Sequence, residues 1–272
     1  MAVKCLELRF GGDVWVRYPE RMRFPLAFRK VYPFRGRGII AGILFALHYL
    51  HLDRVFLHAV VQSDDRLNDV ALFWPSRRRS VGRYYGYRVR DGKIVAYFKF
   101  ASTAEEKIKL QRECANVKQI AEIRGRSFNV PQCKGCDVIY GDMCACFDAL
   151  PEGAANVPVS TYWYERVLNA CHQISQAGFM HGDFAWHNFK VVGEELWILD
   201  WEEMRKGGPK LSDEISLLFG CEYYWRKKPL KDVLMLFRRK YEGAAWPDAL
   251  VAVRDLQERK ITMGDILGRA FL

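Results

Sequence analysis

Three oxygen-bearing side chains near the middle of the chain have the types and the spacing that phosphoryl transfer requires. Asp183 ends a His-Gly-Asp triplet that begins at His181. Asn188 follows Asp183 by five positions, and Asp200 follows it by seventeen. Carboxylate and amide oxygens are the hard ligands that Mg²⁺ prefers, and a nearby carboxylate could orient an acceptor hydroxyl. The spacing therefore predicts a magnesium-dependent catalytic centre, with its acid on a loop, where catalytic groups commonly lie.

Phosphoryl transfer from ATP also needs a cation on the phosphates, and Lys99 is the candidate. It lies between aromatic residues in a segment typical of a buried strand. A lysine in such a strand costs free energy unless it is paired, so the following helix should supply an acid. Glu113, within the apolar stripe of that helix, is the first choice, and Glu106 is the second. The alternative is that Lys99 is a charge on an edge strand.

A small sheet and one helix must position Lys99. Strands are predicted over residues 69–75, 84–90 and 93–100, and a further strand pair over residues 133–147. The hairpin turns are expected at Asp91-Gly92 and at Gly141-Asp142. A helix opens at Ser102 or Thr103, each with a glutamate three positions later, and ends near residue 123. These elements add up to a five-stranded sheet with one helix.

The residues of the catalytic centre need a second, mainly helical scaffold. Ser160 caps a helix that Gly178 ends. Two short strands are predicted over residues 189–192 and 196–199. Their hairpin brings Asn188 and Asp200 to one point, and the pattern beyond Ser212 is helical. The predicted fold class is therefore α+β, with a small sheet-rich lobe followed by a larger helical lobe.

The chain resembles the aminoglycoside phosphotransferase and choline kinase group of the protein-kinase-like superfamily. The resemblance rests on H-G-D-x-x-x-x-N at residues 181–188, I-L-D-W-E at residues 198–202 and P-K-L-S-D at residues 209–213. It implies a protein-kinase-like bilobal fold, with a small N-terminal antiparallel sheet lobe carrying one helix and a larger helical C-terminal lobe. The expected domains are an N-terminal extension over residues 1–68, an N-lobe over residues 69–150 and a C-lobe over residues 151–272.

By this resemblance ATP and Mg²⁺ are the cofactors, and the motif residues take defined roles. Asp183 is the catalytic base, and His181 belongs to the same catalytic triplet. Asn188 and Asp200 bind magnesium. Asp213 is similar to the family's buried acid, which accepts backbone amides of the catalytic loop, and a plain helix cap is the alternative.

The segments expected to hold the nucleotide depart from the better-known relatives. Between the first two predicted strands only Gly82 provides easy backbone freedom, and three arginines precede it at residues 77–79. Three interpretations of these arginines stay open: they contact the ATP phosphates, they contact an anionic acceptor, or they form a solvated turn. The resemblance places the hinge at about residues 147–150, so backbone groups from Phe147 to Leu150 are expected to contact adenine.

Four of the eight cysteines raise the question of a metal site. Cys133 and Cys136 form C-x-x-C, and Cys144 and Cys146 form C-x-C, a spacing that could hold zinc. On the strands of a hairpin these cysteines would instead fill alternate positions and pack as thiols. Packing is favoured over metal, because residues 137–147 have the pattern of a hairpin. A disulfide frame is not expected in a chain of this size without a secretory signal.

The acceptor is expected to be a hydroxyl of a small molecule or a glycan. Only residues 201–211 separate Asp200 from the next helix, which is short for the activation segment that holds a protein substrate. Residues 223–228 combine aromatic and basic side chains, which suits a sugar with anionic groups or, equally, a partly buried helix face. The alternatives are a lipopolysaccharide or cell-surface glycan kinase, then a protein kinase, then an inactive pseudokinase. Scattered basic residues without a reading module argue against nucleic-acid binding.

Composition and charge do not decide between a cytoplasmic location and one at a membrane surface. Lys and Arg number 42 against 32 acidic residues, a net charge of +10 that suits anionic ligands, an anionic membrane surface or plain solubility. The longest apolar stretch, residues 39–47, is too short to span a bilayer, which needs about 20 residues. With no secretory signal pattern, a cytoplasmic location is expected. A short amphipathic helix within residues 39–47 leaves room for peripheral contact at the inner membrane face. The oligomeric state is not indicated.

Overall fold

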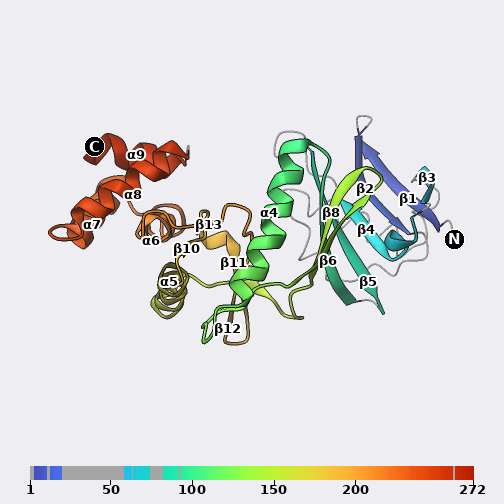
Figure 1. The fold of residues 1–272 in the computed structure, drawn as a ribbon, viewed down its shortest axis with the longest axis horizontal. Coiled ribbons are helices and arrows are strands. Elements are labelled where there is room, and N and C mark those ends of the chain that lie inside the picture. The colour runs from blue at the N-terminus through green and yellow to red at the C-terminus, as the bar shows by residue number, and fades with distance from the viewer. Residues whose placement is uncertain are drawn as a thin grey trace. The chain divides into compact units, whose positions relative to one another are not determined.

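The structure, a computed structural model, describes residues 3–10, 13–19, 58–62, 64–73, 82–91, 93–259 and 261–272. The chain divides into two compact units (Figure 1). The first comprises Met1–Cys114 and Cys133–Ala149, and the second comprises Ala115–Gln132 and Leu150–Leu272. The amphipathic helix predicted within residues 39–47 and the arginines at residues 77–79 lie outside the described residues. The first unit is rich in strand and the second mainly helical, which confirms the predicted α+β class.

An antiparallel sheet of eight strands forms the first unit (Figure 1). In spatial order the strands are β3 (His58–Gln62), β1 (Val3–Phe10), β2 (Asp13–Pro19), β4 (Val70–Phe73), β5 (Arg83–Arg90), β6 (Lys93–Ala101), β8 (Asp142–Asp148) and β7 (Cys133–Ile139). The last five are the strands predicted from the sequence, so the predicted count of five is wrong. The three additional strands come from the part of the chain expected to form an extension before residue 69.

A buried charge explains why β1 does not have the sequence pattern of a strand. Glu7 is fully buried, and it lies directly opposite Arg17 of β2, with which it forms an ion pair. A charge therefore occupies an inward position where strand patterns normally place an apolar side chain. Pairing offsets the cost of burying the carboxylate.

A long helix begins in the first unit, and a tight turn joins two of the unit's strands. Helix α4 (Ala104–Ala121) begins after Thr103, whose hydroxyl accepts a hydrogen bond from the amide of Glu106 at 3.4 Å, so the predicted cap is confirmed. Tyr140 and Gly141 connect β7 to β8 with φ values of 54° and 80°. Two consecutive left-handed residues are typical of the type I′ hairpin turn. This turn lies one residue earlier than predicted, because Asp142 already begins β8.

The sheet of the first unit has an apolar core on one face. Leu67, Val70, Leu72, Ala96, Phe98, Phe100, Ile139 and Cys144 form this cluster. The side chain of Lys99 alternates with Phe98 and Phe100 along β6, so it points to the other face. That other face carries α4, since Lys99 contacts Glu113 of this helix.

Short strands in the second unit surround the predicted catalytic segment. They are β9 (Ala155–Asn156), β10 (Phe179–Met180), β11 (Phe189–Val192), β12 (Glu195–Ile198) and β13 (Arg205–Lys206). The hairpin of β11 and β12 confirms the predicted strand pair. Helix α5 (Thr161–Gln176) precedes β10, and the hydroxyl of Ser160 caps it by accepting a hydrogen bond from the amide of Trp163. Gly178, with φ of 82°, ends it as predicted.

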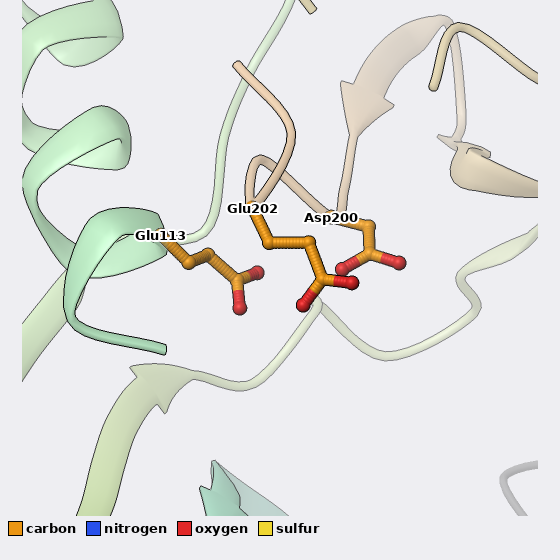
Figure 2. Close-up of side chains that lie close together, drawn as sticks. All are labelled: Glu113, Asp200 and Glu202. Carbon is orange, nitrogen blue, oxygen red and sulfur yellow. The ribbon is translucent and has the colours of Figure 1, made fainter. Parts of the chain in front are cut away.

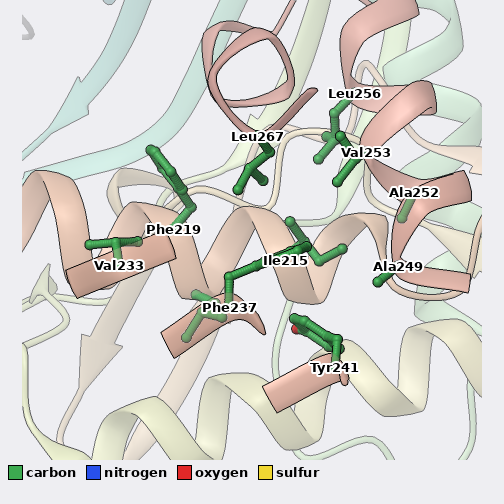
Figure 3. Close-up of a cluster of buried hydrophobic side chains, with 11 residues drawn as sticks. Ile215, Phe219, Val233, Phe237, Tyr241, Ala249, Ala252, Val253, Leu256 and Leu267 are labelled. Atoms are coloured by element: carbon green, nitrogen blue, oxygen red, sulfur yellow. The ribbon is translucent and has the colours of Figure 1, made fainter. Parts of the chain in front are cut away.

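The helices after residue 211 pack around one apolar core, shown in Figure 3. They are α6 (Ser212–Phe219), the π-helical segment η3 (Gly220–Trp225), α7 (Leu230–Tyr241), α8 (Trp246–Glu258) and α9 (Thr262–Phe271). Ile215, Phe237, Val253 and Leu267 are each at most 1% exposed, and they come from four different helices. This core fixes the position of α6, which begins beside the catalytic loop. None of the helices in the described part of the chain is long and apolar enough to cross a bilayer.

Candidate active site

The loop after β10 carries His181, Gly182 and Asp183, and its path depends on Gly182. The φ angle of Gly182 is 89°, a conformation that residues with a side chain rarely adopt. A Cβ atom on Gly182 would lie 2.4 Å from the backbone oxygen of Glu203. Only glycine lets the loop pass this close to the segment that follows Asp200.

We expect Gly182→Ala to lower the free energy of unfolding by about 2–5 kcal/mol, as the sum of a left-handed backbone and an overpacked contact. Gly178→Ala is the matched control, because Gly178 also has a positive φ of 82° but has nothing within 4 Å of its Cβ position. The control should lose only the backbone contribution of about 1–2 kcal/mol. Urea unfolding of the two variants measures the difference. Equal losses would mean that the Glu203 backbone moves aside without cost.

The carboxylate of Asp213 holds the backbone of this loop. Its two oxygens accept hydrogen bonds from the amides of His181 at 2.6 Å and Gly182 at 3.0 Å. Asp213 is 4% exposed, and burial raises the pKa of its carboxyl above the ordinary value, while the two amide hydrogen bonds offset part of this effect. The structure therefore confirms the loop-binding acid and not the plain helix cap.

His181 joins the catalytic loop to the strand end that precedes Asp200. Its ring is fully buried, and Nε2 lies 3.0 Å from the carbonyl oxygen of Leu199. A carbonyl only accepts, so Nε2 carries the hydrogen, and Nδ1 accepts the amide of Asp183 at 3.3 Å. Both ring nitrogens of His181 form hydrogen bonds with the backbone, so His181 has the geometry of a positioning residue. The sequence-based prediction had counted it among the catalytic residues.

A charged cluster from α8 also supports the loop. Arg259 donates a hydrogen bond to the carbonyl oxygen of Gly182. Asp255 orients Arg259 through an ion pair at 3.2 Å, pairs with Arg205, and accepts a hydrogen bond from the hydroxyl of Ser212. The conformation at Gly182 thus depends on residues that lie more than seventy positions later in the chain.

Asp183 and Asn188 contact each other across the catalytic loop. The side-chain nitrogen of Asn188 donates to the carbonyl oxygen and to Oδ2 of Asp183, both at 3.0 Å. This leaves Oδ1 of Asn188 as its remaining ligand atom. Asn188 is 5% exposed, whereas the side chain of Asp183 is 46% exposed. A half-exposed acid beside buried loop residues is accessible to an acceptor hydroxyl.

Asp200 lies two residues after the end of β12, in a conformation that few residues adopt. Its φ angle is 65°, and such backbone strain outside glycine concentrates at functional sites. The amide of Leu199 donates to the carbonyl oxygen of Asn188 at 2.9 Å, so the hairpin of β11 and β12 places Asn188 beside the strand end that carries Asp200.

Glu202 is a further acid of this site to which the sequence analysis assigned no role. Figure 2 shows its carboxylate beside that of Asp200, and ligand oxygens of the two groups lie within 4.8 Å of each other. The acid two positions after Asp200 in I-L-D-W-E was the available signal. These two carboxylates and the amide oxygen of Asn188 are hard oxygen donors of the kind that Mg²⁺ prefers.

Aromatic side chains pack the backbone around these polar residues. Phe184, Trp186, Phe189 and Trp201 are each at most 2% exposed. The rings of His181 and Trp201 lie 4.4 Å apart, and those of Phe184 and Phe189 lie 4.8 Å apart. The indole nitrogen of Trp186 donates to the carbonyl oxygen of Val157 at 2.9 Å. Packing of this kind keeps a site rigid without using its polar atoms.

In the first unit, Lys99 is paired as predicted. Its Nζ lies 2.7 Å from Oε1 of Glu113, and the two side chains are 12% and 3% exposed. Glu106, the second choice, instead pairs with Arg83 and Lys109. Because β6 lies between β5 and β8, the edge-strand alternative is wrong. Oε2 of Glu113 is buried and has no hydrogen-bond partner among the described residues.

Gly82, Phe147 and Leu150 are the other residues that the sequence predicts to bind the nucleotide. Gly82 has φ of 85°, and its carbonyl oxygen accepts a hydrogen bond from the amide of Ser102 at 2.8 Å, so it is fixed at the start of α4. Phe147 is buried on β8, with its ring 6.0 Å from Nζ of Lys99. Leu150 follows the end of β8. The adenine contacts expected from residues 147–150 stay a prediction.

The cysteines of the β7 and β8 hairpin are free thiols. Cys144 and Cys146 fill alternate positions on β8 and face the apolar core, as predicted for packing. On β7 Cys133 is half-buried and Cys136 is exposed, so the packing prediction is wrong for Cys136. In the described part of the chain, no three cysteines lie close enough together to hold one metal ion.

Comparisons with known proteins add only a distant likeness. No protein-family model matches the chain, and no curated protein matches it. Among solved structures, a high-resolution crystal structure of WbdD is 14% identical with a TM-score of 0.45, covering 63% of this chain and 41% of that chain. WbdD with the kinase inhibitor LY294002 is 14% identical at 0.45, covering 71% and 49%. A medium-resolution structure of the bifunctional kinase-methyltransferase WbdD is 15% identical at 0.42, covering 60% and 39%. The chain thus spans less than half of each WbdD chain, and a likeness this distant assigns no activity to it.

Proposed function

We propose that this protein is an ATP-dependent phosphotransferase that moves the γ-phosphoryl group of Mg-ATP to a hydroxyl of a small molecule or a glycan. The observation that carries the proposal is the contrast in exposure within the catalytic loop. Asp183 keeps 46% of its side chain accessible, while His181, Asn188 and Asp213 around it are at most 5% exposed and hydrogen-bonded. A rigid loop that presents one carboxylate is suited to orient an acceptor hydroxyl and to accept its proton.

The second unit supplies the acid and the metal ligands. Oδ1 of Asn188 and the carboxylate of Asp200 are the proposed magnesium ligands, with Glu202 beside them. When bound, Mg²⁺ neutralises charge on the phosphates. Asp183 orients the acceptor through Oδ1 and Oδ2, one of which is fixed by Asn188. His181 and Asp213 hold the loop in position and contact neither metal nor acceptor.

The first unit supplies the cation. Lys99 is nearly buried on a central strand, where it forms an ion pair with Glu113 at 2.7 Å. Its ammonium is the group proposed to contact the phosphate oxygens of ATP. This arrangement, together with Asp183, Asn188 and Asp200, argues against an inactive pseudokinase, because that class usually lacks one of these groups.

A glycan carrying anionic groups is the acceptor class that one surface favours. Tyr224 and Trp225 in η3 are 42% and 38% exposed, unusual for large rings, and exposed Arg226, Lys227 and Lys228 follow them directly. Arg226 and Lys228 pair with Glu222, which keeps both cations in place. Rings that stack on sugars beside cations suit an acidic saccharide, including one at a cell surface. Contact of the same basic surface with an anionic membrane is a further part of this proposal.

Mg-ATP should raise the melting temperature of the protein. A ligand at one hundred times its Kd adds about 2.7 kcal/mol of stability, which corresponds to roughly 5–10 °C for a chain of this size. ATP with EDTA should lose most of the shift, because the oxygen ligands need the metal. Differential scanning fluorimetry measures this, and ADP-ribose with Mg²⁺ serves as a nucleotide control. No shift with Mg-ATP would favour the inactive pseudokinase.

The reaction itself is tested with labelled ATP and a panel of hydroxyl acceptors. The panel contains simple sugars, aminoglycosides, choline-like alcohols, and neutral and acidic glycan fragments. Transfer of label to one class identifies the acceptor, and preference for acidic over neutral glycans supports the role of residues 224–228. Transfer to none, with a normal Mg-ATP shift, would contradict both acceptor classes.

A further inference from the structure

Three cysteines of the first unit converge from a helix and an edge strand. Cys114, on α4, is 6% exposed. Cys133 and Cys136 lie on β7, where Cys133 is half-buried and Cys136 is exposed. All three are free thiols, and none has a place in the proposed phosphoryl transfer.

A bulge places Cys133 and Cys136 on the same face of the sheet. Residues three positions apart on a regular strand point to opposite faces. In β7, however, Cys133 lies opposite Phe147 and Gly135 lies opposite Cys146, so Lys134 is an extra residue. Cys136 then lies opposite Ala145. Phe147 and Ala145 alternate with Cys146 and share one face, and therefore both cysteines share that face as well.

This shared face is the one that α4 covers. Ala145 lies opposite Lys99 in the neighbouring strand pair, and Lys99 reaches Glu113 of α4. Cys114 follows Glu113 directly on this helix, and the thiols of Cys133 and Cys136 both raise the pKa of its thiol. The hydrogen bond with Cys133 and then burial hold the pKa of the Cys114 thiol well above its ordinary value.

We propose that Cys114 and Cys136 form a redox-active pair, which a hydroperoxide converts into a disulfide between α4 and β7. Exposed Cys136 reacts first: its sulfur attacks one peroxide oxygen, the O–O bond breaks, and a sulfenic acid and water (or an alcohol) result. The sulfur of Cys114 then attacks the sulfenic sulfur, a second water leaves, and the S–S bond forms. Two thiols lose two electrons to the peroxide, and a dithiol reductant reverses the reaction.

The bond would fix the helix turn that carries Glu113 to the edge of the sheet. Because Glu113 is the partner of Lys99, the oxidation state of the two cysteines and the position of this ion pair become linked. The redox chemistry of Cys114 and Cys136 does not depend on the proposed kinase activity, because disulfide formation is measured directly. A metal site is the weaker interpretation, because the three thiols are not mutually within ligand distance.

Trypsin separates the three cysteines, which makes the test direct. Cleavage after Arg112, Lys118, Arg126 and Lys134 places Cys114 in residues 113–118, Cys133 in residues 127–134 and Cys136 in residues 135–166. The full chain is treated with stoichiometric hydrogen peroxide, alkylated, digested without reduction and analysed by mass spectrometry. We expect a mass loss of about 2 Da relative to the reduced chain and a link between residues 113–118 and 135–166. Dithiothreitol should remove the link.

Matched serine variants assign the link to one thiol. Cys136→Ser should lower its yield by about tenfold or more, since the accessible sulfur is absent. Cys146→Ser, in the same peptide but on the opposite face, should leave the yield unchanged. Thermal melting checks that both variants fold. A link from residues 113–118 to 127–134, a link that persists in Cys136→Ser, or Cys136 sulfinic acid with Cys114 unlinked would each overturn the proposal.

Discussion

An Asp183→Asn variant is expected to lose about 10²- to 10⁴-fold in kcat, the range that a positioned general base contributes. Asparagine has nearly the same shape, and its amide oxygen can still accept the hydrogen bond from Asn188. It cannot take the acceptor's proton, however. The KM for ATP should change little, because Asp183 is not a proposed nucleotide ligand. Initial rates of label transfer from ATP to the acceptor measure both constants.

Two controls belong to this experiment. Glu194→Gln changes an exposed acid in the turn between β11 and β12 and should keep the wild-type rate. The Mg-ATP thermal shift of Asp183→Asn should equal that of the wild type, which shows an intact fold and nucleotide site. A variant that keeps more than about a tenth of the wild-type rate would remove Asp183 from the role of base.

Asp200→Asn is expected to fail at an earlier step, the binding of the metal. The neutral amide oxygen is a poorer magnesium ligand than a carboxylate. The Mg-ATP thermal shift should therefore fall to the value seen with ATP and EDTA. The rate should drop by about 10²- to 10³-fold, as for loss of one electrostatic stabiliser of the transition state.

Asparagine is the right replacement at Asp200 because of the backbone. The φ angle of 65° is one that asparagine tolerates and alanine does not, so Asp200→Ala would mix loss of a ligand with backbone strain. Isothermal titration with Mg²⁺ and a non-hydrolysable ATP analogue gives the affinity. Unchanged metal-dependent binding in Asp200→Asn, with normal binding in Asp183→Asn, would assign the metal to other residues.

The parts of the site that could be predicted from the sequence are those for which the local residues allow only one stable arrangement. Lys99 lies among aromatic residues on a central strand, where an unpaired ammonium is unstable, and Glu113 was the acid on the facing stripe. The hairpin of β11 and β12 follows from its turn and short length, and it brings Asn188 next to the end of β12. The contacts of Asp213 matched the role implied by family resemblance.

The parts that sequence reasoning missed depend on long-range pairing. β1 and β2 are stabilised by the Glu7–Arg17 pair, and neither residue alone indicates a buried strand. The bulge at Lys134 depends on the register of β7 against β8, which no local pattern specifies. Glu202 gains its significance only from the turn that places it beside Asp200.

The support that Arg259 gives to Gly182 has a consequence for biosynthesis. The predicted catalytic loop is translated well before α8, yet the hydrogen bond to the carbonyl of Gly182 comes from Arg259, directly after that helix. A nascent chain on the ribosome therefore carries the catalytic residues for some time without the arginine that shapes their backbone. We therefore expect the loop at Gly182 to reach its final conformation only after the segment through Arg259 has left the exit tunnel.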